Sequence, residues 1–446
     1  MVVSMRLRRV LSSSLLPVVL AMTLFEAPGS VAAASPSTAA LDDARALRDA
    51  TGLPSDAQTV ENSFRSTDYD DELAGIPLSG AEQKIFIQVV GAQTELGAVA
   101  TTAASLKEFV GAYFEGPELH LVATDVASMK ESLGTALPAG VAVQFETAEY
   151  PASELEQAKS AIIEWSRNAP SGGYVRSVYV NPRSGRVEVG VYSELPAVTK
   201  VLAEEYGDMV DVIHEATGVG GLLACTVNDC GTKGGLKIVK GAVTCTSGFE
   251  VREIGDFQHS DFYLMTAAHC LTDSGGLGST SSWKNGAGTL TYGRNIAYEN
   301  QPTNDIGIIG DGATPATRNQ YYRGGGAVVS IVGEAAASAQ TSGVVVCRNG
   351  ATSAYDCGAI SRANISFRYQ DGTAFNNYWE VRMSSTFGDS GAGFVQGTSA
   401  NIAAGILSGG ETRSGVAYTY YNPTVWDIYD VHPRSYSLKV CATAAC

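Results

Sequence analysis

The sequence predicts an α+β half followed by an all-β half in a chain of 446 residues. Helical and strand-like patterns alternate between residues 35 and 220, whereas short β-type runs between glycine-rich turns fill residues 221–446. Charge divides the chain at the same point, because residues 41–220 carry a net charge of −16 and residues 221–446 one of −2. All eight cysteines follow residue 220. We therefore expect two parts with separate functions.

Residues 1–34 have the pattern of a secretory signal peptide. A basic start with Arg6, Arg8 and Arg9 precedes an apolar stretch at 10–25, and small residues follow at 32–34. A membrane anchor is the alternative, but Pro17 and the serines before it shorten the apolar run below a membrane span. The sequence therefore predicts a secreted, extracellular protein without a membrane anchor.

The first half, 35–220, has a pattern of alternating helices and strands without cysteine. We expect helices near 41–50, 106–114, 126–133, 153–165 and 196–206, the fourth begun by a capping box at Ser153 and Glu156. We expect strands at 85–90, 118–123, 141–145 and 209–213, a solvated loop at 68–72 and a hairpin at 173–191. The glycine-rich stretch 216–235 then has the composition of a junction that is easily cleaved.

The second half has ten short β-type runs and predicts an antiparallel barrel or sandwich. The runs are 248–252, 262–266, 289–292, 306–309, 327–332, 344–347, 359–365, 379–381, 393–395 and 402–407. One helix is expected, at 423–429.

Charge and cysteine use limit the partners of the chain. A formal charge of −16 argues against nucleic-acid binding, which needs a basic face. An even number of cysteines in one half predicts four disulfides in an oxidising compartment. Zinc is the alternative for the pairs Cys225/Cys230 and Cys441/Cys446, but no histidine is close to either pair. We expect no metal and no cofactor.

Three polar residues in the second half carry the parts of a nucleophilic triad. Ser390 stands among small residues, so its hydroxyl would be the nucleophile and His269 the base that takes its proton. Asp305, before an apolar run, would orient the imidazole; Asp311 is a rival in a turn. The N–H groups of Gly388 and Ser390 would form the oxyanion hole. A disulfide between Cys245 and Cys270 would fix the turn that carries His269.

The segments Thr-Ala-Ala-His-Cys at 266–270, Asn-Asp-Ile-Gly-Ile-Ile at 304–309 and Gly-Asp-Ser-Gly at 388–391 together resemble the chymotrypsin-fold serine peptidases. The likeness covers roughly 234–440 and is greatest to the secreted bacterial branch, the streptogrisins and α-lytic protease. It implies two antiparallel six-stranded β-barrels, trypsin-like, in residues 221–446. It also implies that residues 35–220 are a pro-region that assists folding, inhibits the enzyme and is cleaved off.

The resemblance implies further site residues. It predicts a disulfide Cys347–Cys357 and a buried ion pair between Arg348 and Asp389. It places the start of a C-terminal helix at 420–423. It also gives a substrate-binding set: Ser384, Ser385, Phe387, Ser408, Gly409 and Gly410.

The chain departs from the family pattern at two places. Ala392 stands where relatives often have glycine, and the usual disulfide beside the specificity pocket is missing. The pattern does not explain Cys225, Cys230, Cys441 and Cys446. Two local bridges, Cys225–Cys230 and Cys441–Cys446, are our first expectation, and a link between the two ends of the barrel domain is the alternative.

The predicted substrate specificity rests on side chains that are absent from the segment before Ser390 and from position 407. Residues 383–386 contain no aspartate for a basic side chain, and Leu407 stands where glutamate-specific relatives use histidine. Both features favour cleavage after apolar or small residues. Glu411 could favour a basic residue instead, or be a solvated rim charge.

The sequence thus predicts a secreted serine endopeptidase that cuts proteins or peptides through an acyl-enzyme and matures from an autoprocessed zymogen. We expect a monomer whose partners are its substrates and its own pro-region. A secreted esterase or lipase using His432 is one alternative, but too few residues follow Ser390 for that fold. A non-catalytic binding protein on a peptidase scaffold is another, but such proteins usually lack a triad member.

Overall fold

The computed structural model describes most of the chain after residue 35. The described residues are 36–66, 68–70, 73–138, 142–168, 175–191, 196–215, 219–220, 233–253, 262–299, 304–310, 319–324, 327–369, 374–397, 401–423, 427–428 and 436–442. Residues 36–446 form one compact unit.

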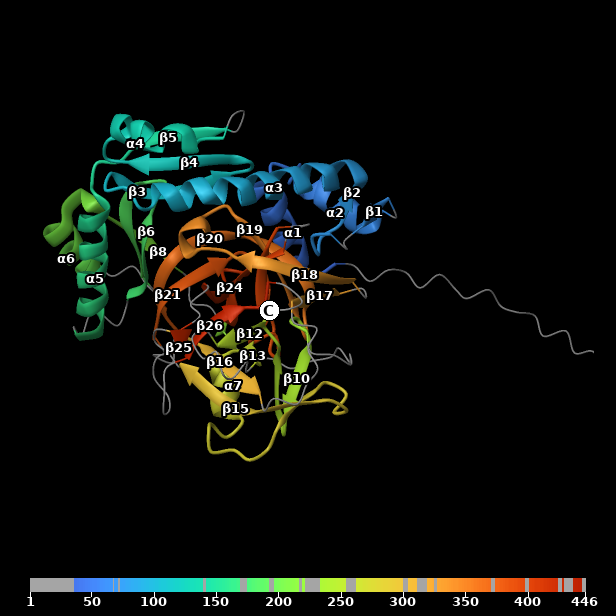
Figure 1. Cartoon of the computed structure of the whole chain (residues 1–446). Coiled ribbons are helices and arrows are strands. Elements are labelled where there is room, and N and C mark those ends of the chain that lie inside the picture. Colours follow the sequence, from blue (N-terminus) through green and yellow to red (C-terminus); the bar gives the residue numbers. More distant parts are fainter. Residues whose placement is uncertain are drawn as a thin grey trace, which may run out of the picture. The chain divides into compact units, whose positions relative to one another are not determined.

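Three capped helices open this unit (Figure 1). They are α1 (Thr38–Ala50), α2 (Ala57–Arg65) and α3 (Gly80–Ala103), and the two-residue strands β1 (Tyr69–Asp70) and β2 (Leu78–Ser79) pair between them. The side chains of Ser37, Asp56 and Ser79 accept hydrogen bonds from the first turns of the three helices. The solvated loop predicted at 68–72 therefore includes a short strand.

The strand predicted at 85–90 is wrong, because these residues lie inside α3. Ser79 and Glu82 form a capping box that starts the helix, and the helix continues for 24 residues. Phe86, Val89 and Val90 are buried while Ile85 and Ile87 are exposed, which is helical spacing. A short apolar run of this kind does not by itself distinguish a helix from a strand.

A three-stranded sheet follows, formed by β3 (Phe109–Glu115), β4 (Glu118–Ala123) and β5 (Val143–Thr147). The helix predicted at 106–114 is therefore wrong in its greater part. A tight turn at Gly116, whose φ of +56° suits glycine, folds β3 back on β4. Cross-strand pairing in that hairpin overrides the weak helical pattern of the segment. The predicted helix at 126–133 is confirmed as α4 (Val126–Leu133).

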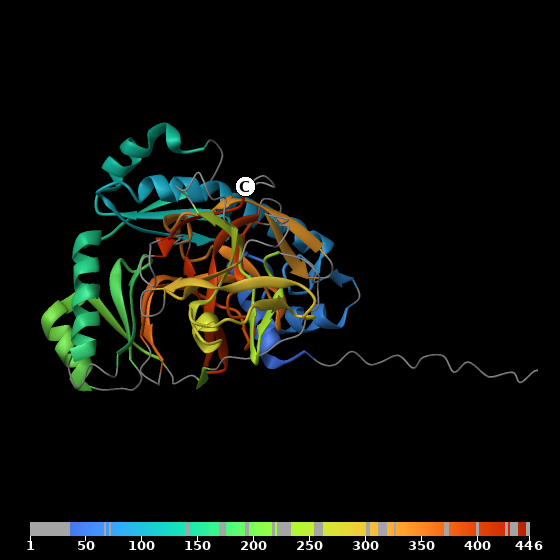
Figure 2. The same ribbon diagram turned by 60° about the horizontal axis from the view of Figure 1, so that its bottom comes forward.

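Two helices pack on one face of the next three strands (Figure 2). The helices are α5 (Ala152–Asn168) and α6 (Pro196–Tyr206), and the strands are β6 (Val175–Asn181), β7 (Arg186–Val191) and β8 (Val210–His214). Their apolar side chains share one core. These elements confirm the predicted hairpin, the last strand and both helices, although α5 begins one residue before Ser153.

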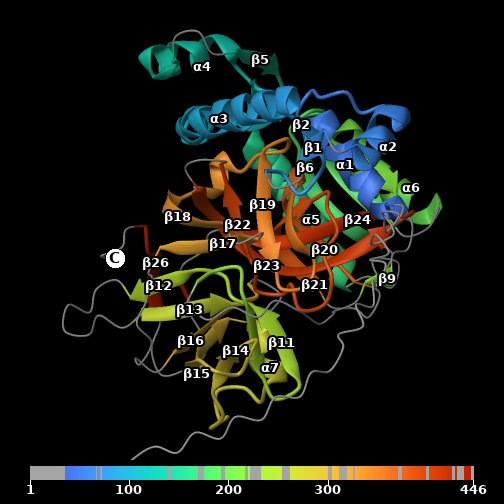
Figure 3. The same ribbon diagram turned by 90° about the vertical axis from the view of Figure 1, so that its right-hand side faces the viewer.

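The second half is mostly β, as predicted, and its strands lie in two sheets (Figure 3). One has the order β11-β10-β14-β15-β16-β13-β12-β26-β25, and the other contains β17, β18, β23, β22, β19 and β20 with β21 and β24. The bounds in the first sheet are β10 Lys237–Lys240, β11 Val243–Thr246, β12 Glu250–Glu253, β13 Phe262–Thr266, β14 Trp283–Asn285, β15 Thr291–Glu299, β16 Ile306–Gly310, β25 Asp427–Ile428 and β26 Tyr436–Val440. Those in the second are β17 Gln320–Gly324, β18 Ala327–Glu334, β19 Val345–Gly350, β20 Ala354–Arg368, β21 Ala374–Val381, β22 Gly393–Gln396, β23 Asn401–Arg413 and β24 Val416–Pro423.

The second sheet continues into the first half of the chain. β6 pairs with β20, with Val178 opposite Ser366, so that β7 and β8 extend the same sheet. A two-residue strand, β9 (Val219–Gly220), pairs with β23 further along the chain. Two separate strand pairings, β6 with β20 and β9 with β23, therefore join the first half of the chain to the strands of the second half.

The helix predicted at 423–429 is wrong within the described residues. Pro423 ends β24, which pairs with β23, and Asp427–Ile428 pair with β26 as β25. The start of the C-terminal helix expected at 420–423 is likewise strand. Ladder hydrogen bonds with β21 and β23 satisfy this backbone, which leaves no reason for a helix there.

Candidate active site

His269 and Asp305 come from neighbouring elements. His269 lies in the short helix α7 (Ala268–Asp273) directly after β13, and Asp305 directly precedes β16. β13 and β16 pair in antiparallel fashion, with Thr266 opposite Gly307, so the two side chains meet at one end of the pair. Nδ1 of His269 lies 2.7 Å from Oδ2 of Asp305, and the backbone N–H of His269 donates to Oδ1 at 2.9 Å.

Two further residues hold Asp305 in place, one at its carboxylate and one at its backbone N–H. The hydroxyl of Ser408 donates to Oδ2 at 2.6 Å, and the N–H of Asp305 donates to Oδ1 of Asn422 at 2.9 Å. The sequence predicted Ser408 for substrate binding, which stays a prediction, and its side chain contacts the carboxylate. Asn422 was missed, since a lone asparagine beside a proline carries no catalytic signal. The rival Asp311 lies outside the described residues.

The environment shifts both pKa values of the pair in opposite directions. Burial lowers the pKa of His269, but the Asp305 carboxylate outweighs it, so the pKa is raised above its ordinary value. Burial raises the pKa of Asp305, but His269 and the hydrogen bonds from Ser408 and His269 hold that pKa below its usual range. The carboxylate therefore stays ionised and fixes the imidazole.

Ser390 lies on a glycine turn that the surrounding backbone holds tightly. Its carbonyl accepts from the Thr246 N–H at 2.8 Å, and the hydroxyl of Thr246 donates to the Gly388 carbonyl at 2.5 Å. Gly388 and Gly391 have φ angles of +95° and +89°, a region that suits glycine. A Cβ at Gly391 would lie 2.0 Å from Oγ1 of Thr266. Glycine is therefore required directly after Ser390 and favoured two residues before it.

The Cys245–Cys270 disulfide brings this turn and His269 into one neighbourhood. Cys270 follows His269 directly, and its Sγ lies 3.9 Å from the Ser390 carbonyl oxygen. The same bridge ties α7 to β11. The three residues expected to form a triad thus lie on elements that contact one another.

The structure also contains the expected Cys347–Cys357 disulfide, which crosses the β19–β20 hairpin. Cys441 is disulfide-bonded as well, but its partner lies outside the described residues. Cys225, Cys230 and Cys446 lie outside them too, so the pairing of these four cysteines stays a prediction.

Arg348 and Asp389 are both fully buried, and their closest charged atoms are 3.7 Å apart. Burial raises the pKa of Asp389, but Arg348 and the hydrogen bonds to the carboxylate keep it lowered. Backbone N–H groups of Thr352, Ser353 and Thr386 donate to this carboxylate at 2.8–3.0 Å. The residue before Ser390 is therefore anchored to the loop between β19 and β20.

The expected substrate-binding residues lie beside one another across two segments. A Cβ at Gly410 would lie 2.2 Å from Oγ of Ser385, and one at Gly409 would lie 2.9 Å from the Tyr369 hydroxyl oxygen. Phe387 contributes its carbonyl, which accepts from the Thr352 hydroxyl at 2.8 Å. The absence of a Cβ at both glycines therefore lets Ser385 and Tyr369 approach β23 closely.

A carboxylate from the first helix also contacts one of these expected substrate-binding residues, Ser384. Oδ2 of Asp43 in α1 accepts from the Ser384 N–H at 3.0 Å, and Asp43 is buried. Burial raises the pKa of Asp43 against the lowering by its hydrogen bonds with Ser384. Nothing in the sequence pattern of an ordinary amphipathic helix indicated this contact.

Leu407, which precedes Ser408 in β23, packs with aromatic side chains. Phe394 and Tyr421 stack with ring centroids 4.5 Å apart in the same apolar cluster as Leu407. No side chain of this cluster carries a charge.

The described residues contain no group of three His, Cys, Asp or Glu side chains that could hold a metal ion. Within the same residues, no helix is long and apolar enough to cross a membrane.

Known proteins similar to this chain are bacterial serine proteases. Glutamyl endopeptidase 2 of Streptomyces griseus is 29% identical over 186 residues, which are 41% of this chain and 88% of the relative. Streptogrisin-C of Streptomyces griseus is 29% identical over 189 residues, which are 42% of this chain and 36% of the relative. The solved structure of Thermobifida fusca protease A is 27% identical and covers 44% of this chain and 92% of its own, with a TM-score of 0.34. No family model matches the chain.

These relatives define the class of the protein as serine-type endopeptidase. Within that class, its relatives are bacterial serine proteases, streptogrisin-C and streptogrisin-D of Streptomyces griseus among them. The resemblance inferred from the three sequence motifs is thereby confirmed.

Proposed function

We propose that this chain is the zymogen of a secreted serine endopeptidase in which Ser390, His269 and Asp305 are the catalytic triad. The observation that carries the proposal is the 2.7 Å contact of His269 with a buried, ionised Asp305 beside the glycine turn of Ser390. We propose with it that the two sheets of the second half correspond to the two six-stranded barrels of the family.

The residues have distinct tasks in the reaction. Oγ of Ser390 attacks the substrate carbonyl while Nε2 of His269 takes its proton, and the N–H groups of Gly388 and Ser390 donate to the oxyanion. His269 then gives the proton to the leaving amine, and the acyl-enzyme forms. Water repeats the attack with His269 as base and frees Ser390. Asp305 holds the imidazole in the useful tautomer, which is the general role of the carboxylate in a Ser-His-Asp triad.

We propose that residues 35–220 are the pro-region, which assists folding, occupies the site and is then cleaved off. The pairing of β6 with β20 and of β9 with β23 supports this role. Signal removal near residue 34 and release outside the cell complete the proposed maturation.

The register of β9 predicts the bond that is cut. Gly220 lies opposite Glu411 and Val219 opposite Thr412, so β9 runs antiparallel to β23 toward Ser408. The N–H of Gly391 donates to the Leu407 carbonyl at 2.8 Å, which brings the turn of Ser390 against β23 next to Ser408. A chain continuing this register would have its third residue after Gly220 level with Ser408. In this sequence that residue is Leu223, and cleavage after it also fits an apolar preference.

The proposed specificity for apolar or small residues rests on the uncharged side chains of residues 383–387 and of Leu407. Oγ of Ser385 would lie 2.2 Å from a Cβ at Gly410, and Leu407 packs in one apolar cluster with Phe394 and Tyr421. Residues 383–386 contain no acidic side chain that could receive a lysine or arginine.

Maturation and digestion of casein test the proposal together. Ser390→Ala should be secreted uncut and should not digest casein, while His269→Ala should behave in the same way. His432→Ala should mature and digest casein normally. Loss of activity in His432→Ala alone would instead support the esterase alternative. N-terminal sequencing of the mature product should begin at Ala224.

A further inference from the structure

Glu411 is a buried carboxylate at the end of the strand segment proposed to bind substrate. It directly follows Gly410 in β23 and is 6% exposed. Its Oε1 contacts the guanidinium of Arg176 in β6 and accepts from the hydroxyl of Tyr420. Nε of Arg413 lies 3.5 Å from the same oxygen. A carboxylate this deeply buried requires such partners.

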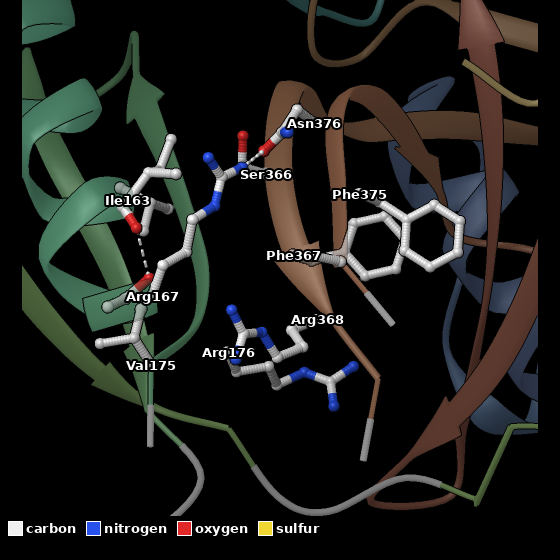
Figure 4. A pocket seen from close by; sticks show the side chains of 12 residues that line it. Ile163, Arg167, Val175, Arg176, Ser366, Phe367, Arg368, Phe375 and Asn376 are labelled. Atoms are coloured by element: carbon white, nitrogen blue, oxygen red, sulfur yellow. Dashed lines mark hydrogen bonds between the residues drawn. The ribbon is translucent and has the colours of Figure 1, made fainter. Parts of the chain in front are cut away.

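Arg176 is the closest cation to Glu411 among the described residues, and it belongs to the proposed pro-region. Its Nε lies 2.8 Å from Glu215, also in that region. Figure 4 shows Arg176 reaching from β6 toward the strand that carries Phe367, across a cavity of about 30 Å³. Removal of the pro-region would take Arg176 away from Glu411.

The remaining cation near Glu411 is shared. Arg413 also forms ion pairs with Glu380 and with Glu215, and Glu380 in turn has Arg362 at 3.5 Å. Loss of Arg176 and Glu215 on cleavage leaves two carboxylates and two guanidinia, which are balanced in charge, but the short contact to Glu411 is lost. The Glu411 carboxylate would then keep Tyr420 and the 3.5 Å approach of Arg413 Nε, and the position of Arg176 would be open to a new cation.

β9 shows how a bound chain meets this carboxylate. Gly220 lies directly opposite Glu411, and directly opposite side chains in an antiparallel pair lie about 4.5–5.5 Å apart at Cβ. The residue that this chain places there is glycine, so it brings no side chain to Glu411, and Arg176 contacts the carboxylate instead.

We propose that Glu411 and Tyr420 form a subsite of the mature enzyme for a basic substrate side chain at the fourth residue before the scissile bond. The inference rests on the proposed endopeptidase function and on the register of β9, in which a cut after the residue opposite Ser408 puts the fourth residue before it opposite Glu411. An arginine fits better than a lysine, because its planar fork can reach a carboxylate with two N–H groups. Arg176 then acts in the zymogen as a stand-in for the substrate's own cation.

The test uses the wild-type chain after secretion and self-cleavage. The enzyme digests a denatured protein mixture, and mass spectrometry maps every cut. Arginine and lysine should be enriched at the fourth residue before the cut at least about fivefold over the third and fifth residues, an enrichment that a charge-assisted hydrogen bond can supply. No enrichment at the fourth residue overturns the subsite and leaves the endopeptidase standing. No cuts at all would overturn the proposed function itself.

A double variant links the preference to Glu411. Glu411→Gln combined with Arg176→Gln avoids an unpaired charge in the zymogen, and its cuts should show no basic preference at the fourth residue. Glu299→Gln in β15 removes one negative charge elsewhere and should keep the preference. If the double variant is not secreted, the single variant Glu411→Gln, in which Arg176 keeps its ion pair with Glu215, should lose the basic preference in the same way. An enrichment that survives in either variant overturns the role of Glu411.

Discussion

At the scale of single residues, the contact between His269 and Asp305 determines how the enzyme should respond to pH. Only the neutral imidazole can take the proton of Ser390, and Asp305 raises the pKa of His269 above 6.5 in spite of burial. Activity should therefore rise with pH as His269 loses its proton, and the midpoint should lie above that of an ordinary histidine.

The pH dependence of kcat/KM for an uncharged peptide substrate measures this midpoint. We expect an acidic limb with an apparent pKa above 6.5, the ordinary histidine value. An acidic limb of kcat/KM whose midpoint lies below pH 6.5 would contradict the assigned role of His269. A kcat/KM that does not change between about pH 5 and 8 would contradict it as well.

The glycine after the nucleophile gives a second prediction for a single residue. Gly391→Ala would place a Cβ 2.0 Å from Oγ1 of Thr266 and 2.5 Å from the Thr246 carbonyl oxygen, at a φ of +89°. Backbone atoms cannot move aside as a flexible side chain can, so we expect no secreted, mature enzyme.

Gly288→Ala is the matched control. Gly288 also has a positive φ, +73°, but nothing lies within 4 Å of the added Cβ. This variant should be secreted and active, with a loss in free energy of unfolding of about 1 kcal/mol. Secretion titres and thermal unfolding compare the two, and equal behaviour would show that crowding at Gly391 is unimportant.

At the scale of elements, strong local sequence signals predicted helices and turns correctly. Predictions failed where the pairing of distant strands determines the secondary structure. Residues 196–206 begin with proline and form the predicted helix, and the turn at 182–185 forms the predicted hairpin. Residues 85–90 look like a buried strand because the apolar run is short, and only the capping box at 79–82 reveals the helix. Residues 427–428 are strand because β26 pairs with them, and that partner is not visible in the local sequence.

Glu215, which follows β8, forms buried ion pairs with Arg176 of β6 and with arginines of β20 and β23. These ion pairs should make the stability of the uncut chain depend on pH. Burial opposes ionisation of Glu215, but Arg362, Arg413 and Arg176 lower its pKa from 4.5 to about 2. A lowered folded pKa means that this contribution to stability is present above about pH 4.5 and is lost as the pH falls toward 2.

Thermal unfolding of the uncut Ser390→Ala chain tests this contribution. The melting temperature should fall between about pH 5 and pH 3, and the fall should be smaller in a chain that also carries Glu215→Gln. Equal falls in the two chains would show that Glu215 does not contribute to the acid sensitivity.

At the scale of the whole molecule, the sequence predicted the class of the protein from three short motifs. Those motifs belong to chemistry that needs particular residues, so His269, Asp305 and Ser390 could be proposed as a triad without a structure. The contacts of Asp43 with Ser384 and of Arg176 with Glu411 could not be found, because they join residues more than 200 positions apart through ordinary helix and strand patterns. Division of the chain into a catalytic half and a removable half stays a prediction that maturation must test.

The central claim is that Ser390 is the nucleophile of a self-maturing endopeptidase. The most direct measurement is to label the secreted wild-type protein with a fluorophosphonate, digest it and locate the adduct by mass spectrometry. We predict one adduct, on Ser390, which is absent from His269→Ala and from protein unfolded before labelling. An adduct on another residue, or an active enzyme that the probe does not label, would contradict the claim.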